Sequence, residues 1–532
     1  MALTGKQLIN GQWQTGEVGT FSAKDPSNGA TLVPEYGIAS LQQVDAAVAA
    51  AADAFAVYRQ TSLAQRSAFL HACADEIMAL GDALSEQVMA ETGYPKGRAE
   101  GERARTCGQL HMFADYILGG EYLDPRIDTA MPDRQPIPRP DLRYVNQALG
   151  PVVVFGASNF PLAYSVAGGD TASALAAGCP VIVKGHPSHP GTGELVAQAL
   201  FSAAQKTGMP AAVIQLLNDV GHEVGSALVQ APAIKAVGFT GSLKGGMALF
   251  NLANARPEPI PVFAEMGSIN PVVMLPKALA QSAKELATGF VGSLTMGTGQ
   301  FCVNPGLILA IDNADLTTFI DATAAALSAV PAGVMLNAGI CSAYEQGASH
   351  FTDIAGVEEV GSGGNTEANS GSYAQAKLLT TDAATFLAQP ALQEEVFGPL
   401  SLVVKCQNTQ QIKQIINSLK GQLTGTLRAA DDAELAEHLD LIDAFSQRVG
   451  RVVINGFPTG VEVCPAMVHG GPFPASTDSR FTSVGTAAIA RFVRPVCYQA
   501  VPDGLLPAAL QNANPLALTR VVNGNPTKDP IA

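Results

Sequence analysis

The chain has 532 residues, which is too long for one ordinary hydrophobic core, so two or three domains are expected. Apolar residues make up 47% of the chain and charged residues only 14%, a composition that favours a large folded core and argues against disorder. The net charge of −15 disfavours nucleic acid and anionic membrane surfaces, so neither is expected as a partner.

The first part of the chain is predicted to be helical. Its N-terminus lacks a charged segment followed by an apolar one, so no secretory signal and a cytoplasmic location are expected. Alanine-rich stretches with apolar residues at helical spacing predict helices over 41–58 and 63–92. Five prolines then fall within 124–140, which predicts a linker or an extended arm.

Strands and helices alternate after this proline-rich segment. The pattern predicts strands at 150–156, 180–184, 213–217 and 234–239, with helices at about 163–177 and 193–207. Short connections between such units indicate a parallel, doubly wound, Rossmann-like sheet, whose ligands bind at the carboxyl ends of the strands. The fold class expected is therefore α/β.

A second α/β pattern follows the proline-rich junction before Val262. It extends over 263–470, with strands expected at 271–275, 306–311 and 400–404. The final segment, 501–532, is rich in proline, asparagine and alanine and is expected to be an extended tail. The eight cysteines are scattered without metal-ligand spacing, so reduced thiols and no metal site are expected.

Three segments could carry chemistry, although each has an ordinary structural interpretation. A strand runs directly into a helix at 238–242, where backbone N–H groups and the Ser242 hydroxyl could bind a pyrophosphate. A tight turn with a serine N-cap explains this segment equally well. Cys302 follows a glycine-flanked approach at 297–301, yet most cysteines are inert. Glu265 alone could be a solvated surface carboxylate.

The ordered set of segments is more specific than any one of them. Over about residues 8–500 it resembles the aldehyde dehydrogenase superfamily, with matching order and spacing across some four hundred residues. The segments that carry the resemblance are 9–13, 91–93, 158–161, Lys184, 238–242, 265–267, 299–302 and 394–399.

The resemblance implies covalent hydride-transfer chemistry. Cys302 would attack the aldehyde carbon as a thiolate and form a thiohemiacetal. Asn159 and the Cys302 backbone N–H would stabilise the oxyanion. Glu265 would activate the water that releases the acid, and could also help to deprotonate the thiol. A small aldehyde is therefore the expected substrate.

The resemblance also implies how the nicotinamide cofactor binds. Gly241 and Ser242 match the pyrophosphate contacts. Glu395 matches the carboxylate for the nicotinamide ribose, with Phe397 packing beside it. Lys184 matches the lysine that binds the adenosine ribose.

Cofactor preference depends on the residues immediately after Lys184. NAD-preferring relatives usually have a glutamate three residues on, but this chain has Pro187. His186 and Ser188 could donate to a 2′-phosphate alongside Lys184, although both could equally be ordinary loop residues. NADP is therefore expected to be preferred, with NAD possible.

The stretches 184–190, 299–306 and 461–480 resemble a subgroup containing 2,5-dioxovalerate dehydrogenases and bacterial NADP-linked fatty aldehyde dehydrogenases. We expect 2,5-dioxovalerate as the substrate, with a long-chain aliphatic aldehyde as the alternative. Arg480, Ser476 and Thr477 are candidates for binding a substrate carboxylate, although an arginine is more often a surface residue. The positions matching the family's substrate tunnel, each of which could instead belong to the core, are Tyr164, Phe301, Phe457 and Phe473.

Two departures concern the substrate tunnel. Many family members have a Pro-Phe-Gly-Gly segment where this chain reads Gly-Pro-Phe-Pro-Ala-Ser at 471–476, and the sequence after Cys302 also differs. A cysteine hydrolase or acyltransferase would use the same nucleophile without a nucleotide. It would need a histidine base, and none of the eight histidines falls in a motif with Cys302. A purely structural role would leave the whole set of motifs unexplained.

The resemblance also implies a domain organisation and a homodimer or homotetramer. The expected division is a cofactor-binding domain at 1–121 and 149–262, a catalytic domain at 263–470, a small β oligomerisation arm at 122–148 and 486–500, and the tail at 501–532.

Overall fold

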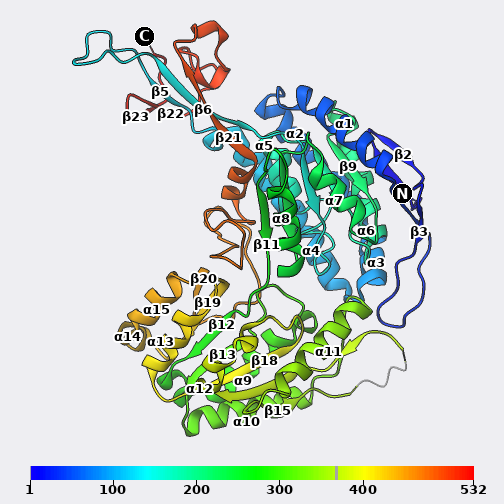
Figure 1. Cartoon of the computed structure of the whole chain (residues 1–532), viewed down its shortest axis with the longest axis vertical. Coiled ribbons are helices and arrows are strands. Elements are labelled where there is room, and N and C mark those ends of the chain that lie inside the picture. Colours follow the sequence, from blue (N-terminus) through cyan, green and yellow to red (C-terminus); the bar gives the residue numbers. More distant parts are fainter. Residues whose placement is uncertain (1, 366–369, 532) are drawn as a thin grey trace.

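The computed structural model describes residues 2–365 and 370–531. It contains two seven-stranded sheets flanked by helices and a five-stranded sheet in an arm that projects from one end (Figure 1). The expected α/β class is confirmed. No described helix is both long and apolar enough to cross a membrane.

The first sheet has the order β11-β10-β7-β8-β9-β1-β2. Five strands are parallel and rich in buried valine, isoleucine and leucine, as expected for a sheet covered on both faces. They are β7 (Val152–Phe155), β8 (Val181–Lys184), β9 (Ile214–Leu217), β10 (Ala236–Thr240) and β11 (Val262–Glu265); the antiparallel edge is β1 (Gln7–Ile9) and β2 (Gln12–Gln14).

The helices associated with this sheet begin near the N-terminus and continue between its strands. They are α1 (Leu41–Tyr58), α2 (Leu63–Ala79), α3 (Gly81–Thr92), α4 (Lys96–Gly119), α5 (Gly169–Ala177), α6 (Pro190–Thr207), α7 (Glu223–Gln230) and α8 (Leu243–Asn254). The helix predicted from about residue 163 begins only at Gly169, because residues 156–168 form the turn that carries Asn159. A short hairpin, β3 (Gly19–Phe21) and β4 (Tyr36–Ile38), lies outside the sheet.

The predicted boundary before residue 263 is wrong. Strand β11 pairs in parallel with β10, with Glu265 opposite Thr240, so it closes the first sheet instead of opening the second. The prolines at 257, 259 and 261 precede this last strand and do not separate two domains. Glu265 therefore stands at the carboxyl end of the first sheet.

The second sheet has the order β15-β17-β18-β13-β12-β19-β20, with only β15 antiparallel to its neighbour. Its strands are β12 (Pro271–Met274), β13 (Leu307–Ile311), β15 (Glu358–Ser362), β17 (Lys377–Asp382), β18 (Leu400–Cys406), β19 (Gln422–Arg428) and β20 (Val449–Ile454). The accompanying helices are α9 (Pro276–Thr295), α10 (Ala314–Ser328), α11 (Ala338–Thr352), α12 (Ala383–Ala388), α13 (Thr409–Ser418), α14 (Asp432–Glu437) and α15 (Leu439–Ser446). Strands β14 (Gly333–Val334) and β16 (Tyr373–Ala374) form a separate pair.

The arm is a sheet of order β21-β6-β5-β22-β23 that joins distant segments of the chain. It comprises β5 (Arg126–Asp128), β6 (Leu142–Ala148), β21 (Val493–Gln499), β22 (Arg520–Val522) and β23 (Asn525–Thr527).

The prediction of an extended tail at 501–532 is wrong. Leu510 and Leu518 pack with Ile127 and Val145 of the arm in one small core. Arg520 is fully buried and donates to backbone carbonyls of the tail itself. The tail folds because these apolar side chains lie among proline and asparagine turns that gave no periodic signal in the sequence.

A buried ion pair joins the base of the arm to the first sheet. Arg491, in the 3₁₀ segment Thr486–Phe492, lies 2.6 Å from Asp170 of α5, and the two side chains are 3% and 10% exposed. Asp170 packs against the Cα of Gly238, where a larger residue would clash with it. The glycine of the 238–242 motif thus makes room for this pair.

Asp170→Ala should lower the free energy of unfolding by about 3–5 kcal/mol, because it leaves the Arg491 charge buried without a partner. Urea unfolding followed by intrinsic fluorescence measures the change. The matched control is Asp440→Ala, which breaks an exposed pair with Lys413 (3.1 Å) and should cost less than about 1 kcal/mol. Equal losses in the two variants would contradict a structural role for the buried pair.

Candidate active site

A left-handed turn presents Cys302. Gly297, Thr298 and Gly299 have φ values of +55°, +57° and +65°, a conformation that glycine adopts at little cost. A Cβ at position 299 would also lie 2.4 Å from the backbone of Gly398. The glycines before Cys302 are therefore required by the backbone and do not make the approach flexible.

Two asparagines hold the nucleophile segment from either side. Asn270 Nδ2 donates to the backbone oxygens of Cys302 (2.8 Å) and Asn304 (2.9 Å). Asn159, which is buried, donates from Nδ2 to the Gln300 carbonyl at 3.0 Å. The structure thus brings the predicted Asn159 beside the turn that leads to Cys302.

The backbone of Asn159 is itself fixed. Its carbonyl accepts hydrogen bonds from Tyr94 Oη and Arg98 Nη2, each at 3.0 Å. The Arg98 guanidinium also stacks on Tyr94 and lies over Phe301, 3.6 and 4.6 Å from the ring centres. Arg98 therefore acts as a fixed support for the amide that would stabilise an oxyanion.

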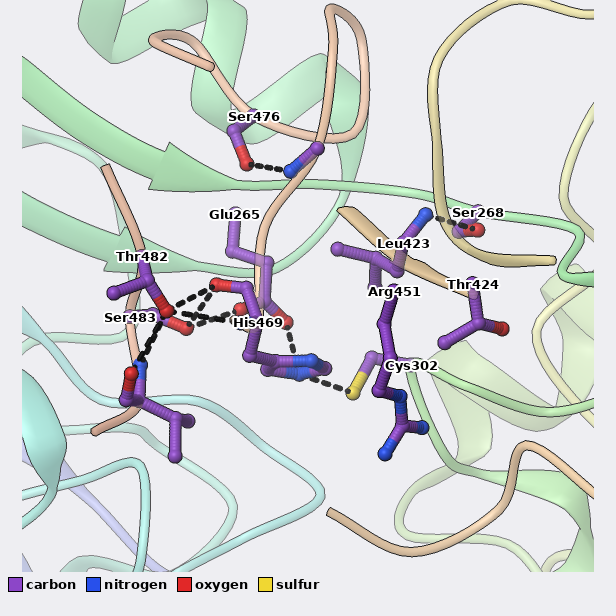
Figure 2. Close-up of polar contacts among 12 residues, drawn as sticks. Glu265, Ser268, Cys302, Leu423, Thr424, Arg451, His469, Ser476, Thr482 and Ser483 are labelled. Carbon is purple, nitrogen blue, oxygen red and sulfur yellow. Dashed lines mark hydrogen bonds and ion pairs between the residues drawn. The ribbon is translucent and has the colours of Figure 1, made fainter. Parts of the chain in front are cut away.

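A histidine lies between the predicted nucleophile and the predicted carboxylate. His469 Nε2 is 3.3 Å from Cys302 Sγ and 3.0 Å from Glu265 Oε1 (Figure 2). His469 and Glu265 are 1% and 3% exposed at their side chains, whereas Cys302 is half-buried. The three groups form a linked set in which a proton can pass between sulphur, imidazole and carboxylate.

The segment after His469 orients both partners. Ser483 Oγ donates to Glu265 Oε2 at 2.6 Å, while the backbone N–H of Ser483 donates to the His469 carbonyl at 2.8 Å. The His469 N–H donates to Thr482 Oγ1 at 2.9 Å. Glu265 Oε1 lies 3.0 Å from His469 Nε2 and accepts no hydrogen bond of good geometry in the described chain.

The surroundings lower the pKa of the Glu265 carboxyl and raise the pKa of the Cys302 thiol. Burial alone would raise the pKa of Glu265, but the His469 ring, the Ser483 hydroxyl and Cys302 together lower it. Burial, followed by the negative charges of Glu265 and Glu395, raises the pKa of Cys302 well above its ordinary value. The resting site therefore holds a carboxylate and a neutral thiol, and the thiol must lose its proton before it reacts.

Sequence reasoning missed His469. It lies 167 positions after Cys302, and such a separation gives no motif that would pair the two residues. The only signal was its place in the segment where the chain departs from the family's usual Pro-Phe-Gly-Gly pattern. No histidine shares a sequence motif with Cys302, but the folded chain brings His469 to it from the segment between β20 and the 3₁₀ segment Thr486–Phe492.

Five of the predicted cofactor residues follow strands β8 and β10 at the carboxyl edge of the first sheet, where nucleotides bind in such folds, namely Lys184, His186, Ser188, Gly241 and Ser242. Lys184 ends β8 and donates from Nζ to the Asp219 carbonyl at 2.9 Å. The His186 ring accepts the Ser188 N–H (3.2 Å) through Nδ1, and Ser188 Oγ accepts from Asn337 of the other half of the molecule (2.9 Å).

Ser242 caps α8, accepting the Gly245 N–H at 3.1 Å, and both Gly241 and Ser242 are exposed at this helix N-terminus. The serine N-cap expected as the ordinary interpretation is therefore present, and it leaves the first turn open to solvent.

The residues expected near the nicotinamide line a hollow beside the nucleophile segment. Its walls include Glu395, Phe397, Phe301 and Gly299. The Glu395 carboxylate lies so close to Gly267 that a Cβ there would meet it at 2.8 Å. Desolvation in this hollow, followed by the charge of Glu265, raises the pKa of Glu395. An exposed helix N-terminus, a lysine at the strand end and this carboxylate together fit a dinucleotide.

Two of the four predicted tunnel positions, Tyr164 and Phe301, are brought together. Tyr164 and Phe301 pack around Phe160, with ring centres 5.3 Å from it, and Tyr164 also approaches His469 at 6.2 Å. Phe457 instead packs on Phe290 of α9.

Phe473 is 57% exposed, and so is not enclosed as a tunnel residue would be. Arg480 is exposed too and pairs with Asp478 two residues away. Ser476 and Thr477 are bound to the backbone of Gly471 and Val262, which leaves the predicted carboxylate-binding group without support.

Comparisons with known proteins agree with this geometry. The profile of the aldehyde dehydrogenase family matches residues 13–473. The chain is 55% identical to α-ketoglutaric semialdehyde dehydrogenase 2 of Azospirillum brasilense over 526 residues, which cover 98% of this chain and 99% of that protein. It is 46% identical to the α-ketoglutaric semialdehyde dehydrogenase of Acinetobacter baylyi, with 98% of each chain covered. The chain therefore belongs to the aldehyde dehydrogenase family.

The fold is shared with more distant members. A crystal structure of betaine aldehyde dehydrogenase from Staphylococcus aureus matches with a TM-score of 0.80 at 20% identity, covering 94% of this chain and 96% of that one. The protein is thus an aldehyde dehydrogenase that uses NAD(P), and the cysteine hydrolase alternative is rejected. Glu265, Cys302 and His469 have donor atoms within 4.8 Å of one another, so a thiophilic metal ion could bind there, but only by blocking the nucleophile.

Glu265→Gln should make Cys302 ionise at lower pH, because it removes the largest negative charge that opposes the thiolate. Alkylation by iodoacetamide across a pH series measures this shift, and the rate below the midpoint should rise about tenfold per unit of pKa lowered. Glu394→Gln, which alters an exposed neighbouring carboxylate, is the control and should leave the profile in place. If the pH profile of alkylation is the same in Glu265→Gln as in the wild type, the Glu265 charge does not raise the pKa of Cys302.

Proposed function

We propose that the enzyme oxidises 2,5-dioxovalerate to 2-oxoglutarate through a thioester on Cys302. The observation that carries the chemistry is the contact of His469 Nε2 with both Cys302 Sγ and Glu265 Oε1, at 3.3 and 3.0 Å. The substrate is supported by the two nearly full-length relatives, whose names specify α-ketoglutaric semialdehyde, which is the same compound.

The reaction begins with the thiol proton. His469 accepts it, directly at Nε2, and the negative Glu265 beside the ring stabilises the resulting imidazolium. The sulphur forms a bond to the aldehyde carbon, and the carbonyl π electrons move to the oxygen. The second N–H of Asn159 Nδ2 and the Cys302 backbone N–H donate to this oxyanion, and losing one such donor costs about 3–4 kcal/mol.

Bound NAD(P) supplies the hydride acceptor at its nicotinamide ring. Loss of hydride from the thiohemiacetal leaves a thioester on Cys302. Glu265 takes a proton from water as that oxygen attacks the thioester carbon, and the carbon–sulphur bond then breaks to release the carboxylate. His469 can return its proton to the departing sulphur, which restores the neutral thiol.

The cofactor is assigned to the strand ends of the first sheet. The α8 N-terminus with Gly241 and Ser242 would bind the pyrophosphate, and Lys184 the adenosine ribose. Glu395 would accept the nicotinamide ribose hydroxyls, with Phe397 packing beside it.

NADP is the preferred form in this proposal, with NAD accepted, because Pro187 replaces the carboxylate that would repel a 2′-phosphate and because His186 and Ser188 lie on the same loop. Asp219 at this strand end would oppose the binding of a 2′-phosphate, because it is a carboxylate whose buried Oδ2 has no hydrogen-bond partner in the described chain.

Pro187→Glu should shift binding from NADP towards NAD, because a carboxylate accepts ribose hydroxyls and repels a phosphate. Quenching of protein fluorescence gives the dissociation constant of each cofactor, and their ratio should change by at least about tenfold. Asp219→Asn tests the opposing charge and should strengthen NADP binding. An unchanged ratio in Pro187→Glu would mean that the 2′-phosphate is recognised elsewhere.

Oligomerisation is assigned to the arm, in keeping with the expected homodimer or homotetramer. The projecting sheet ends at β21 on one side and β23 on the other, and such edges readily pair with another chain. The cofactor and catalytic roles are assigned to the first and second sheets, with Glu265 contributed by the first. A cytoplasmic location is supported by eight cysteines that are all unpaired in the described chain.

Reduced-cofactor absorbance with each aldehyde tests the substrate assignment. Turnover of 2,5-dioxovalerate should exceed that of succinic semialdehyde and of a C6 to C12 aldehyde series in kcat/KM. Cys302→Ala should show no turnover while binding the cofactor as the wild type does. Rates that rise with chain length would instead identify a fatty aldehyde dehydrogenase.

A further inference from the structure

Two arginines from opposite halves of the molecule meet at one loop beside the nucleophile. Arg105 lies on α4, two helical turns after Arg98, and donates to the Val461 carbonyl. Arg451 lies on β20 and donates to the carbonyls of Gly460 (3.0 Å) and Pro458 (2.7 Å). Since Gly460 and Val461 are consecutive, both guanidinium groups bind the same loop.

This loop is part of the wall around the catalytic sulphur. Val461, Phe301 and Cys302 all pack against one small cluster, which consists of Val303, Leu423 and Ala475. In Figure 2 the Arg451 side chain passes beside Cys302, with its guanidinium on the sulphur side. Burial lowers the pKa of Arg451, and the nearby Cys302 and Tyr164 oppose that change.

Both guanidinium groups keep donors to spare. Each arginine offers five N–H groups, and Arg451 uses only its two terminal nitrogens on backbone oxygens. Its Nε is buried without a partner. Neither Arg105 nor Arg451 forms an ion pair with any carboxylate in the part of the chain that the structure describes. The buried Glu102 carboxylate on α4 interacts electrostatically with Arg105 without a direct ion pair, and carbonyl oxygens contact both guanidinium groups.

A third polar group faces the same region without a partner. The Tyr164 hydroxyl is buried, has no hydrogen bond of good geometry in the described chain, and lies within reach of Arg105 and near Cys302. Tyr164 also stands 6.2 Å from the His469 ring, measured between ring centres. A buried hydroxyl left unbonded costs free energy, which a hydrogen bond from a bound ligand would offset.

The charges already in the site make such positive groups necessary for an anionic substrate. Glu265 and Glu395 both lie within electrostatic range of Cys302 and would repel a carboxylate. Arg98 is already engaged by the Asn159 carbonyl and by three aromatic rings, and its remaining Nη1 lies against Gly297. Arg105 and Arg451 remain, and arginine binds carboxylates through paired N–H···O contacts.

We infer that Arg451 and Arg105 form the subsite for the carboxylate of the substrate, with the Tyr164 hydroxyl donating to its 2-oxo group. This inference rests on the proposed 2-oxo acid semialdehyde activity. The aldehyde and the carboxylate are at opposite ends of a five-carbon chain, so anchoring the latter brings the reacting carbon to Cys302. The subsite selects against neutral aldehydes of equal length, which would leave both guanidinium charges unpaired.

Arg451→Met and Arg105→Met should each lower kcat/KM for 2,5-dioxovalerate by about 100-fold, mainly through KM, because each removes one charged partner. Neither variant should lower kcat/KM for pentanal, which has the same chain length and no carboxylate. Glutarate, used as a non-reactive probe in calorimetry, should bind the wild type and lose affinity in both variants. Arg480→Met, at an exposed arginine paired with Asp478, is the matched control and should change nothing.

Three outcomes would overturn the subsite. Equal losses for 2,5-dioxovalerate and pentanal would show that the arginines only hold the 458–461 loop. Unchanged kinetics with 2,5-dioxovalerate, or unchanged glutarate affinity, would place the carboxylate elsewhere. A wild type that does not prefer 2,5-dioxovalerate to pentanal contradicts the proposed function instead, and glutarate affinity in the variants then still decides whether the subsite exists.

Discussion

The chemistry depends on a single juxtaposition, in which the imidazole of His469 separates a neutral thiol from a negative carboxylate. Burial and two carboxylates keep Cys302 protonated, so its nucleophile is generated only when a proton can leave. In the proposed mechanism His469 Nε2 accepts this proton, and Glu265 stabilises the charge that the ring acquires. The turn at 297–299 and the serine and threonine after His469 serve to keep these atoms at contact distance.

The same arrangement explains how one carboxylate can serve two steps. In the proposed mechanism Glu265 is the counter-ion of the protonated imidazole, and after the thioester has formed it also takes the proton from water. Its Oε2 is held by Ser483, whereas Oε1 accepts no hydrogen bond in the described chain and stays available to a proton. A site with this much negative charge would reject an anionic substrate, which is why the arginines beside the 458–461 loop matter to the substrate assignment.

The sequence was sufficient for elements with strong local patterns. The alternation of valine-rich strands and helices predicted the first sheet, and Cys302, Glu265 and Asn159 were found because each lies in a recognisable motif. The predicted domain boundary before residue 263 is wrong because prolines indicate a turn but not which sheet the next strand joins. The prediction of an extended tail is wrong because the tail is buried through contacts with β5 and β6, which lie hundreds of residues earlier in the chain.

His469, Arg105 and Arg451 share one reason for being missed. The fold brings each of them towards the site from a segment distant in sequence from Cys302, and no spacing in the sequence encodes that approach. Phe457 and Phe473 show the reverse error, since a family position did not ensure a place beside the nucleophile. Motifs thus located the reacting atoms, whereas proton transfer and substrate charge became visible only in the folded chain.

The most direct test of the account is to trap the acyl-enzyme. Glu265→Gln mixed with NADP and 2,5-dioxovalerate, then quenched with acid, should be examined by intact-protein and peptide mass spectrometry. The account predicts one acyl group per chain, located on the peptide that contains Cys302, because the thioester forms but its hydrolysis lacks a base. An enzyme that turns over with no adduct at any time, or with the adduct on another cysteine, would contradict it.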